Sequence, residues 1–116
     1  MSHWVYLQDD AGETLAMEEP HGINGGTYAV GATECELNIT YNYATILWRV
    51  LGEGGVRSLD GKRARDTIPI LEAAVEQLGD DTHPDYWRET EGNVKAALLG
   101  LLAFAGEHPD GVWSVS

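Results

Sequence analysis

The sequence predicts an α+β fold in which a small antiparallel sheet is covered on one face by about three helices. In the first 43 residues, short segments of alternating apolar and polar side chains are separated by turn-forming residues. From residue 44 onward, apolar side chains recur at helical spacing, before a last short apolar segment closes the chain. Strands therefore precede helices, and the final strand is expected to rejoin the sheet.

Residues 34–43 have the strongest strand pattern in the chain. Their apolar side chains alternate without exception with polar ones, which is the period of a strand with one buried face. The apolar set is Cys35, Leu37, Ile39, Tyr41 and Tyr43. We expect this strand to anchor the core, with Cys35 as a buried thiol.

The segments before it predict further strands. Residues 3–8 predict the first strand, and residues 13–17 are expected to return beside it as a hairpin. Residues 18–26 contain three glycines, an asparagine and a proline and are expected to form a loop. Residues 27–30 predict another short strand. We therefore expect neighbouring strands to pair as an antiparallel meander.

Three helices are predicted after residue 43. Residues 44–51 have apolar positions at helical spacing and are followed by glycines. The second helix is expected at 66–78, with Asp66 as its N-cap. The third spans about 90–105 and precedes a last strand at 111–116, whose tryptophan gains nothing from exposure in a free tail.

Length, charge and cysteine content limit the possible classes of protein. The 116 residues fit a single domain with one core. The net charge of −12 argues against nucleic acid and anionic membranes as partners and favours basic protein surfaces. The single cysteine excludes an intrachain disulfide, and residues 1–4 do not resemble a signal peptide. We expect a cytoplasmic protein.

The polar face of the alternating strand suggests a binding site. It carries Asn38, Thr40 and Asn42, although asparagine is depleted in strands. Side-chain amides both donate and accept hydrogen bonds, so this row can bind a polar ligand or latch a neighbouring loop. Because a helix follows directly, its first amide groups and Arg49 are expected near Asn42. The end of the strand is the expected place for a concave polar spot, but the favoured role of the amides is a latch or a plain solvated face, with a ligand site as the alternative.

Two polar loops offer further candidates. Residues 54–65 hold a basic cluster that includes Arg57 and Arg63. The favoured interpretation is a solvated loop that offsets the acidic surroundings, and the alternative is a site where an anion binds. The second loop contains the aromatic pair Tyr86-Trp87. This pair either plugs the edge of the domain or, if exposed, anchors a binding surface.

No pattern points to a metal, a cofactor or a catalytic centre. The four histidines lack the spacing of metal-ligand pairs, and the glycines of residues 18–26 match no nucleotide-binding fingerprint. Glu34 and Glu36 are expected on an exposed face and Cys35 on a buried one, which disfavours general acid or nucleophilic catalysis. We expect a binding protein rather than an enzyme.

The helix at 90–105 is apolar nearly all round. Its outer face carries one charge, Lys95, among Ala96, Leu99, Gly100 and Ala103. A domain of this size has little second layer with which to bury such a face. We therefore expect a homo-oligomer.

Two short motifs support a family resemblance. Residues 38–42 read Asn-Ile-Thr-Tyr-Asn, and the chain closes with His108-Pro109, Val112 and Val115-Ser116. With the two helices and the acidic, Trp-containing connection between these motifs, the chain resembles a family of small uncharacterised phage and prophage proteins. Tyr41 replaces the histidine that is usual there. The resemblance implies a mobile-element origin, hence the cytoplasm of a host cell, and implies no chemistry.

The leading hypothesis is a non-catalytic accessory factor that engages a host protein or a small polar ligand. The alternative is an oligomer that sequesters a small ligand, for example a nucleotide. Its sites would be formed by Asn38, Thr40, Asn42 and the basic loop of adjacent subunits. An enzyme of unknown reaction is the third hypothesis.

Overall fold

The computed structural model describes residues 2–22 and 30–116. Within them the chain forms an α+β fold, as the sequence predicts, with 3₁₀ helices η1 and η2 beside the α-helices and strands. The elements follow in the order β1 (Ser2–Gln8), β2 (Ala16–Gly22), β3 (Val30–Glu34), β4 (Glu36–Thr40), η1 (Tyr41–Tyr43), α1 (Ala44–Leu51), η2 (Gly55–Leu59), α2 (Ala64–Glu76), α3 (Glu91–Glu107) and β5 (Val112–Val115).

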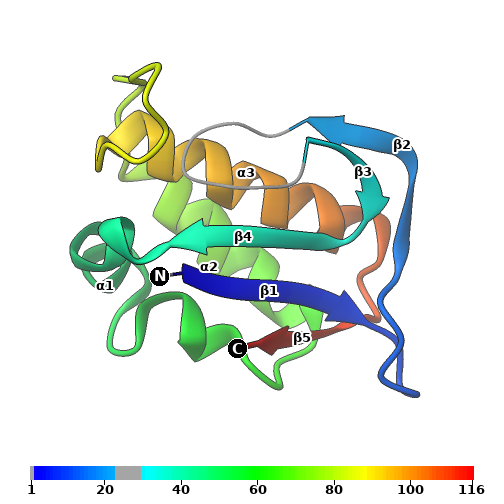
Figure 1. Cartoon of the computed structure of the whole chain (residues 1–116). Helices are drawn as coiled ribbons and strands as arrows, with labels where there is room; N and C mark the ends of the chain where they lie inside the picture. The colour runs from blue at the N-terminus through cyan, green and yellow to red at the C-terminus, as the bar shows by residue number, and fades with distance from the viewer. Residues whose placement is uncertain (1, 23–29) are drawn as a thin grey trace.

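The main sheet has the strand order β4-β1-β5, with both pairings antiparallel. Val5 of β1 lies opposite Leu37 on one side and Val115 on the other. Strands β2 and β3 form a separate two-stranded sheet. Figure 1 shows α2 and α3 on one side of the main sheet, and α1 at the end to which β4 points.

The core lies between the main sheet and the helices. Alternate side chains of the strands face α2 and α3, which is the pattern of a sheet with one covered face. The largest side chain in the core is Trp113 of β5, which is 1% exposed. Its indole Nε1 donates a hydrogen bond of 2.8 Å to Thr67 Oγ1 of α2, so the one polar atom of this side chain is satisfied.

The expected N-terminal meander is wrong for β1. Both edges of β1 pair with strands distant in sequence, and its contact with the segment that follows is reduced to the bridge between Gln8 and Thr14. The expected loop at 18–26 is also wrong up to Gly22, because β2 extends to that residue. Residues 23–26 of that loop and 27–29 of the predicted third strand lie outside the described residues.

The alternating segment 34–43 is not one strand. Cys35 separates β3 from β4, and residues 41–43 turn into η1. Thr40 starts this turn: its Oγ1 accepts a hydrogen bond of 3.2 Å from Asn42 N. The turn shifts the phase of burial, so that Thr40 is buried and Tyr41 is exposed, the reverse of the predicted pattern. Cys35, Leu37, Ile39 and Tyr43 are buried as predicted.

The first helix has the predicted bounds, 44–51, and ends at Gly52, whose φ of 87° favours glycine. The predicted loop at 54–65 is wrong in part, because η2 and the first residues of α2 lie in it, with Val56 and Leu59 buried. Helix α2 starts at Ala64 with Arg63 as its N-cap, so Asp66 lies in the first turn instead of capping it.

The third helix and the last strand are confirmed. Thr90 caps α3 by accepting a hydrogen bond from Asn93 N at 3.1 Å. Strand β5 joins β1, as expected. On the outer side of α3, Leu99 and Ala103 are exposed. No helix within the described residues combines the length and the apolar character needed to cross a bilayer.

Candidate functional site

The structure places Asn38 and Asn42 in different surroundings. Asn38 lies on β4, where its Nδ2 donates a hydrogen bond of 2.6 Å to Ser2 Oγ of the neighbouring strand. Asn42 lies in η1, where its Nδ2 donates a hydrogen bond of 3.0 Å to Trp87 O. With Thr40 buried as the start of the turn, the predicted polar row does not exist as a continuous face. Each amide instead joins two segments that are distant in sequence.

The predicted basic residues also separate. Arg49 of α1 forms an ion pair of 3.1 Å with Glu91 at the start of α3. Arg63 donates a hydrogen bond to Asp110 O and lies 3.7 Å from the carboxylate of Asp10. Arg57 is exposed in η2, and no ion pair in the described part of the chain includes it.

Two residues of the basic cluster at 57–65 are engaged by acidic neighbours. Arg65 pairs with the carboxylate of Asp110, and Arg63 donates a hydrogen bond to the backbone of the same residue. These contacts lower the positive potential at Arg63 and Arg65, whereas no ion pair among the residues that the structure describes includes Arg57 or Lys62.

A hollow does exist at the predicted place, where β4 meets the first helix. We name it the Asn42 groove; its volume is about 780 Å³, it is open to solvent, and it is lined by Tyr41, Asn42, Thr45, Trp87, Arg88, Glu89 and Thr90. Its walls come from η1, α1 and the connection between α2 and α3. Of the six site residues predicted from the sequence, Asn42 lines this groove.

Exposed aromatic side chains surround the groove. Tyr41 is 40% exposed, Trp87 46% and Trp48 53%. Tyr41 and Trp87 line the Asn42 groove, and Tyr41 and Trp48 both line an adjoining hollow of about 20 Å³. Tyr41 belongs to both hollows and so links the other two residues; we name Tyr41, Trp48 and Trp87 together the aromatic strip.

Each ring of the aromatic strip packs against another residue of the protein. The Tyr41 ring packs against the His3 ring with centroids 4.5 Å apart, and the Trp87 ring against Tyr86 at 4.9 Å. The Trp48 indole lies on the backbone of Gly55, where a Cβ would come within 3.1 Å of its Cδ1. The rings are thus ordered before any partner arrives, which reduces the entropy lost on binding.

The connection that carries Trp87 is fixed in the same way. Asp85 Oδ1 accepts a hydrogen bond of 3.0 Å from Trp87 N, and Asn42 donates to Trp87 O. Tyr43 Oη donates a hydrogen bond of 2.6 Å to Tyr86 O. These hydrogen bonds, together with those from Asn93 Nδ2 to Asp85 O and Arg88 O, set the position of a loop that has no regular secondary structure of its own.

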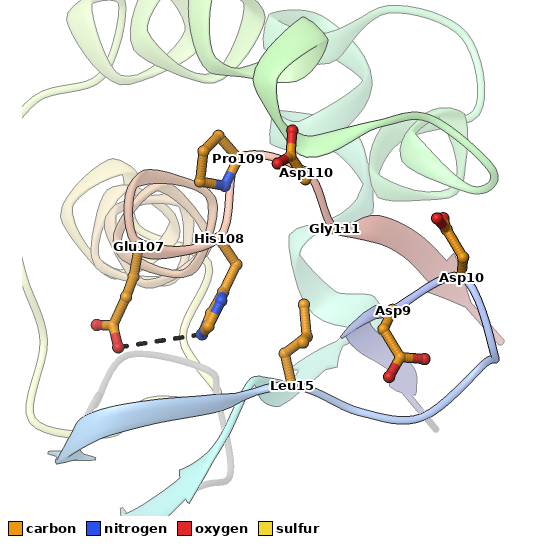
Figure 2. Close-up of a pocket in the computed structure, with 8 residues that line it drawn as sticks. All are labelled: Asp9, Asp10, Leu15, Glu107, His108, Pro109, Asp110 and Gly111. Carbon is orange, nitrogen blue, oxygen red and sulfur yellow. Dashed lines mark ion pairs between the residues drawn. The ribbon is translucent and has the colours of Figure 1, made fainter.

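A second hollow lies between the β1–β2 turn and the end of α3. Its volume is about 270 Å³, and it is lined by Asp9, Asp10, Leu15, Glu107, His108, Pro109, Asp110 and Gly111. Figure 2 shows the side chains of Glu107 and His108 on one side of the hollow and that of Leu15 directed into it. Glu107 Oε1 lies 4.0 Å from His108 Nε2.

Polar groups that line this second hollow form hydrogen bonds between the end of α3 and β2. His108 Nε2 donates a hydrogen bond of 2.6 Å to Ala16 O, and Glu107 Oε1 accepts one of 2.9 Å from Glu18 N. Asp9 Oδ1 accepts hydrogen bonds from two backbone amides of its own turn. These interactions fix β2 against the end of α3, so the hollow is best explained as a joint between the two sheets and α3.

No family model, curated protein or solved structure matches this chain.

Two observations concern the chemistry of the described residues. These residues include no group of three or more His, Cys, Asp or Glu side chains placed to hold a metal ion. Burial, reinforced by the charge of Glu107, raises the pKa of the Cys35 thiol to about 12, so at neutral pH it is almost entirely the unreactive thiol. The exposed rings, in contrast, are available to a partner.

Sequence reasoning missed Trp48 and Tyr41. Tyr41 was assigned to the buried face, and no role was given to Trp48. A signal for Trp48 was present, because Leu47 and Val50 define the buried side of α1 and leave position 48 on the outer side. A single exposed ring is ordinary, but several exposed rings beside one another indicate a surface with a function.

Proposed function

We propose that this protein is a non-catalytic binding protein that holds a partner protein on the aromatic strip and the Asn42 groove. The observation that supports this most is the exposure of Tyr41, Trp48 and Trp87 around two hollows that share Tyr41. Tryptophan, tyrosine and arginine are the residue types that contribute most to binding energy at protein interfaces. Arg88, which lines the groove, adds the third type.

The ordering of the rings supports the same proposal. An exposed ring that moved freely would lose rotational freedom on binding, whereas these three are already supported by His3, Gly55 and Tyr86. Paratopes use tyrosine and tryptophan for this reason, because they offer a large contact area with few rotatable bonds.

The charge of the molecule adds a preference for basic partners. A net charge of −12 attracts positively charged surfaces and speeds their association at low salt. The similarity of residues 38–42 and 108–116 to phage and prophage proteins supports a mobile-element origin. The proposed partner is accordingly a host protein with a basic surface, met in the host cytoplasm.

A homo-oligomer is also proposed, with its interface on the outer side of α3. Leu99 is 47% exposed there, beside the exposed Ala103. Size-exclusion chromatography with light scattering tests this. A mass above that of the 12.6 kDa monomer, lowered to the monomer by Leu99→Asp, is the expected result, and a monomeric wild type contradicts it.

Affinity capture from host lysate tests the proposed function. The wild type is compared with Trp87→Ala and with the matched control Trp4→Ala, because Trp4 is also exposed but lines neither the Asn42 groove nor the adjoining hollow. We expect Trp87→Ala to reduce capture of a specific protein by at least about tenfold, and Trp4→Ala to leave it unchanged. Equal capture by all three proteins contradicts the proposal.

Salt dependence tests the electrostatic part separately. Capture of a basic partner should fall as salt rises, because screening weakens the attraction between exposed charges. If the yield of captured partner does not change with salt, the proposed basic surface on the partner is wrong, whereas binding through the aromatic strip is not affected.

A further inference from the structure

The shape of the aromatic strip limits what can bind there. The hollow between Tyr41 and Trp48 is about 20 Å³, enough for a group of about the size of one water molecule. An amphipathic helix needs a deep apolar groove for side chains at successive turns. The hollow beside Trp48 is too small for this, and the Asn42 groove, although its volume is about 780 Å³, is lined mainly by polar residues. A partner must therefore lie across the rings.

An extended proline-rich segment meets this requirement. Proline-rich chains adopt the polyproline II conformation without internal hydrogen bonds, and they dock on surfaces lined by exposed aromatic rings. Their stiffness keeps the entropy cost of binding low, even where contacts are shallow. Tyr41 shares one hollow with Trp48 and the other with Trp87, so an extended segment that crosses Tyr41 can reach both hollows.

The charges beside the strip indicate the residues that flank the prolines. Glu53, Asp85 and Glu89 are exposed, and no ion pair joins them within residues 2–22 and 30–116. Glu53 precedes Gly54, which lines the hollow beside Trp48, and Glu89 lines the Asn42 groove together with the basic Arg88. The three carboxylates outnumber this one cation. Arginine or lysine in the ligand can pair with these carboxylates and can also stack on the exposed indole rings.

We propose that the aromatic strip recognises an extended, proline-rich segment flanked by basic residues. This inference rests on the proposed function, because it specifies the partner that the same surface takes. The prolines pack between Tyr41 and the two tryptophans, and the basic residues lie beside the acidic side chains at the ends of the strip.

A peptide titration followed by NMR tests this inference. The probe is a synthetic peptide with a run of prolines between arginines, and its controls replace either the prolines by alanine or the arginines by glutamate. The chain has four tryptophans, so four indole N–H signals report on the surface. We expect saturable shifts at Trp48 and Trp87, none at the buried Trp113, and binding at least about tenfold weaker for each control peptide.

Variants identify the surface. Trp48→Ala should weaken binding of the proline-rich peptide by at least about tenfold, and Trp4→Ala should not change it. An unchanged Trp113 signal in each variant establishes that the fold is intact. The absence of shifts, equal binding of the alanine control, or equal shifts at Trp4 overturns the inference. If host-lysate capture still depends on Trp87 when the peptide fails, the proposed function stands and this inference alone is wrong.

Discussion

Asn42 Nδ2 donates a hydrogen bond of 3.0 Å to Trp87 O, which joins the turn after β4 to the connection between α2 and α3. This bond closes one wall of the Asn42 groove and holds the loop on which the Trp87 ring is exposed. The latch that the sequence left as an alternative to a ligand site is thus present, and it borders the hollow.

Loss of the hydrogen bond between Asn42 and Trp87 should lower the stability of the protein measurably. We expect Asn42→Ala to lower the free energy of unfolding by about 1 kcal/mol, or about 4 °C in Tm, because the bond is partly exposed. Asn42→Asp should cost at least as much, since it keeps the size of the side chain but removes the donor. Thermal melts check this, and two unchanged melting temperatures would mean that the bond contributes nothing to the fold.

Two glycines of α3 should respond to the same substitution in opposite directions. A Cβ at Gly92 would lie 2.6 Å from the backbone at both Asp81 and Thr82, whereas one at Gly106 meets nothing within 4 Å. We expect Gly92→Ala to destabilise the protein by about 1–3 kcal/mol, and Gly106→Ala to stabilise it by about 0.5–1 kcal/mol. Urea unfolding of both variants measures the difference, and similar midpoints contradict it.

Much of the fold could be predicted from local patterns, and the site could be predicted only in part. Helices α1 and α3 and strand β5 could be predicted, because the spacing of apolar residues within each segment matches the face that it buries. The central place of β1 depends on pairing with β4 and β5, which no local pattern encodes. Because the chain turns into η1 after Thr40, Thr40 is buried and Tyr41 is exposed, the reverse of the predicted pattern. The place of the hollow was therefore predicted, but the presence of Tyr41 in its lining was not.

The buried hydrogen bond between Trp113 and Thr67 predicts a specific contrast. Thr67→Val leaves the indole N–H buried without an acceptor, and we expect a loss of about 1–3 kcal/mol. Thr67→Ser keeps the hydroxyl and should cost less. Chemical denaturation of the two variants provides the measurement. A valine variant as stable as the serine variant would show that the indole finds another acceptor.

Acid should weaken the hydrogen bonds that Glu91 accepts from Gly79 N and from Arg49. Hydrogen bonds from Gly79 N and then from Arg49 lower the pKa of Glu91 below its ordinary value of 4.5. Because the folded pKa is the lower one, this stabilisation is present above pH 4.5 and is lost as pH falls through the folded pKa. Glu91→Gln should therefore reduce the dependence of the urea midpoint on pH in that range. Identical pH profiles for variant and wild type would refute this role.

The central claim, that the aromatic strip is the surface that meets a partner, is tested most directly by photo-crosslinking in host cells. The residue p-benzoylphenylalanine is placed at Trp87, at Trp48 and at the control position Trp4 in three separate proteins. Our account predicts that positions 87 and 48 crosslink to the same host protein and that position 4 does not. Adducts at position 4 alone, or equal adducts at all three positions, would contradict it.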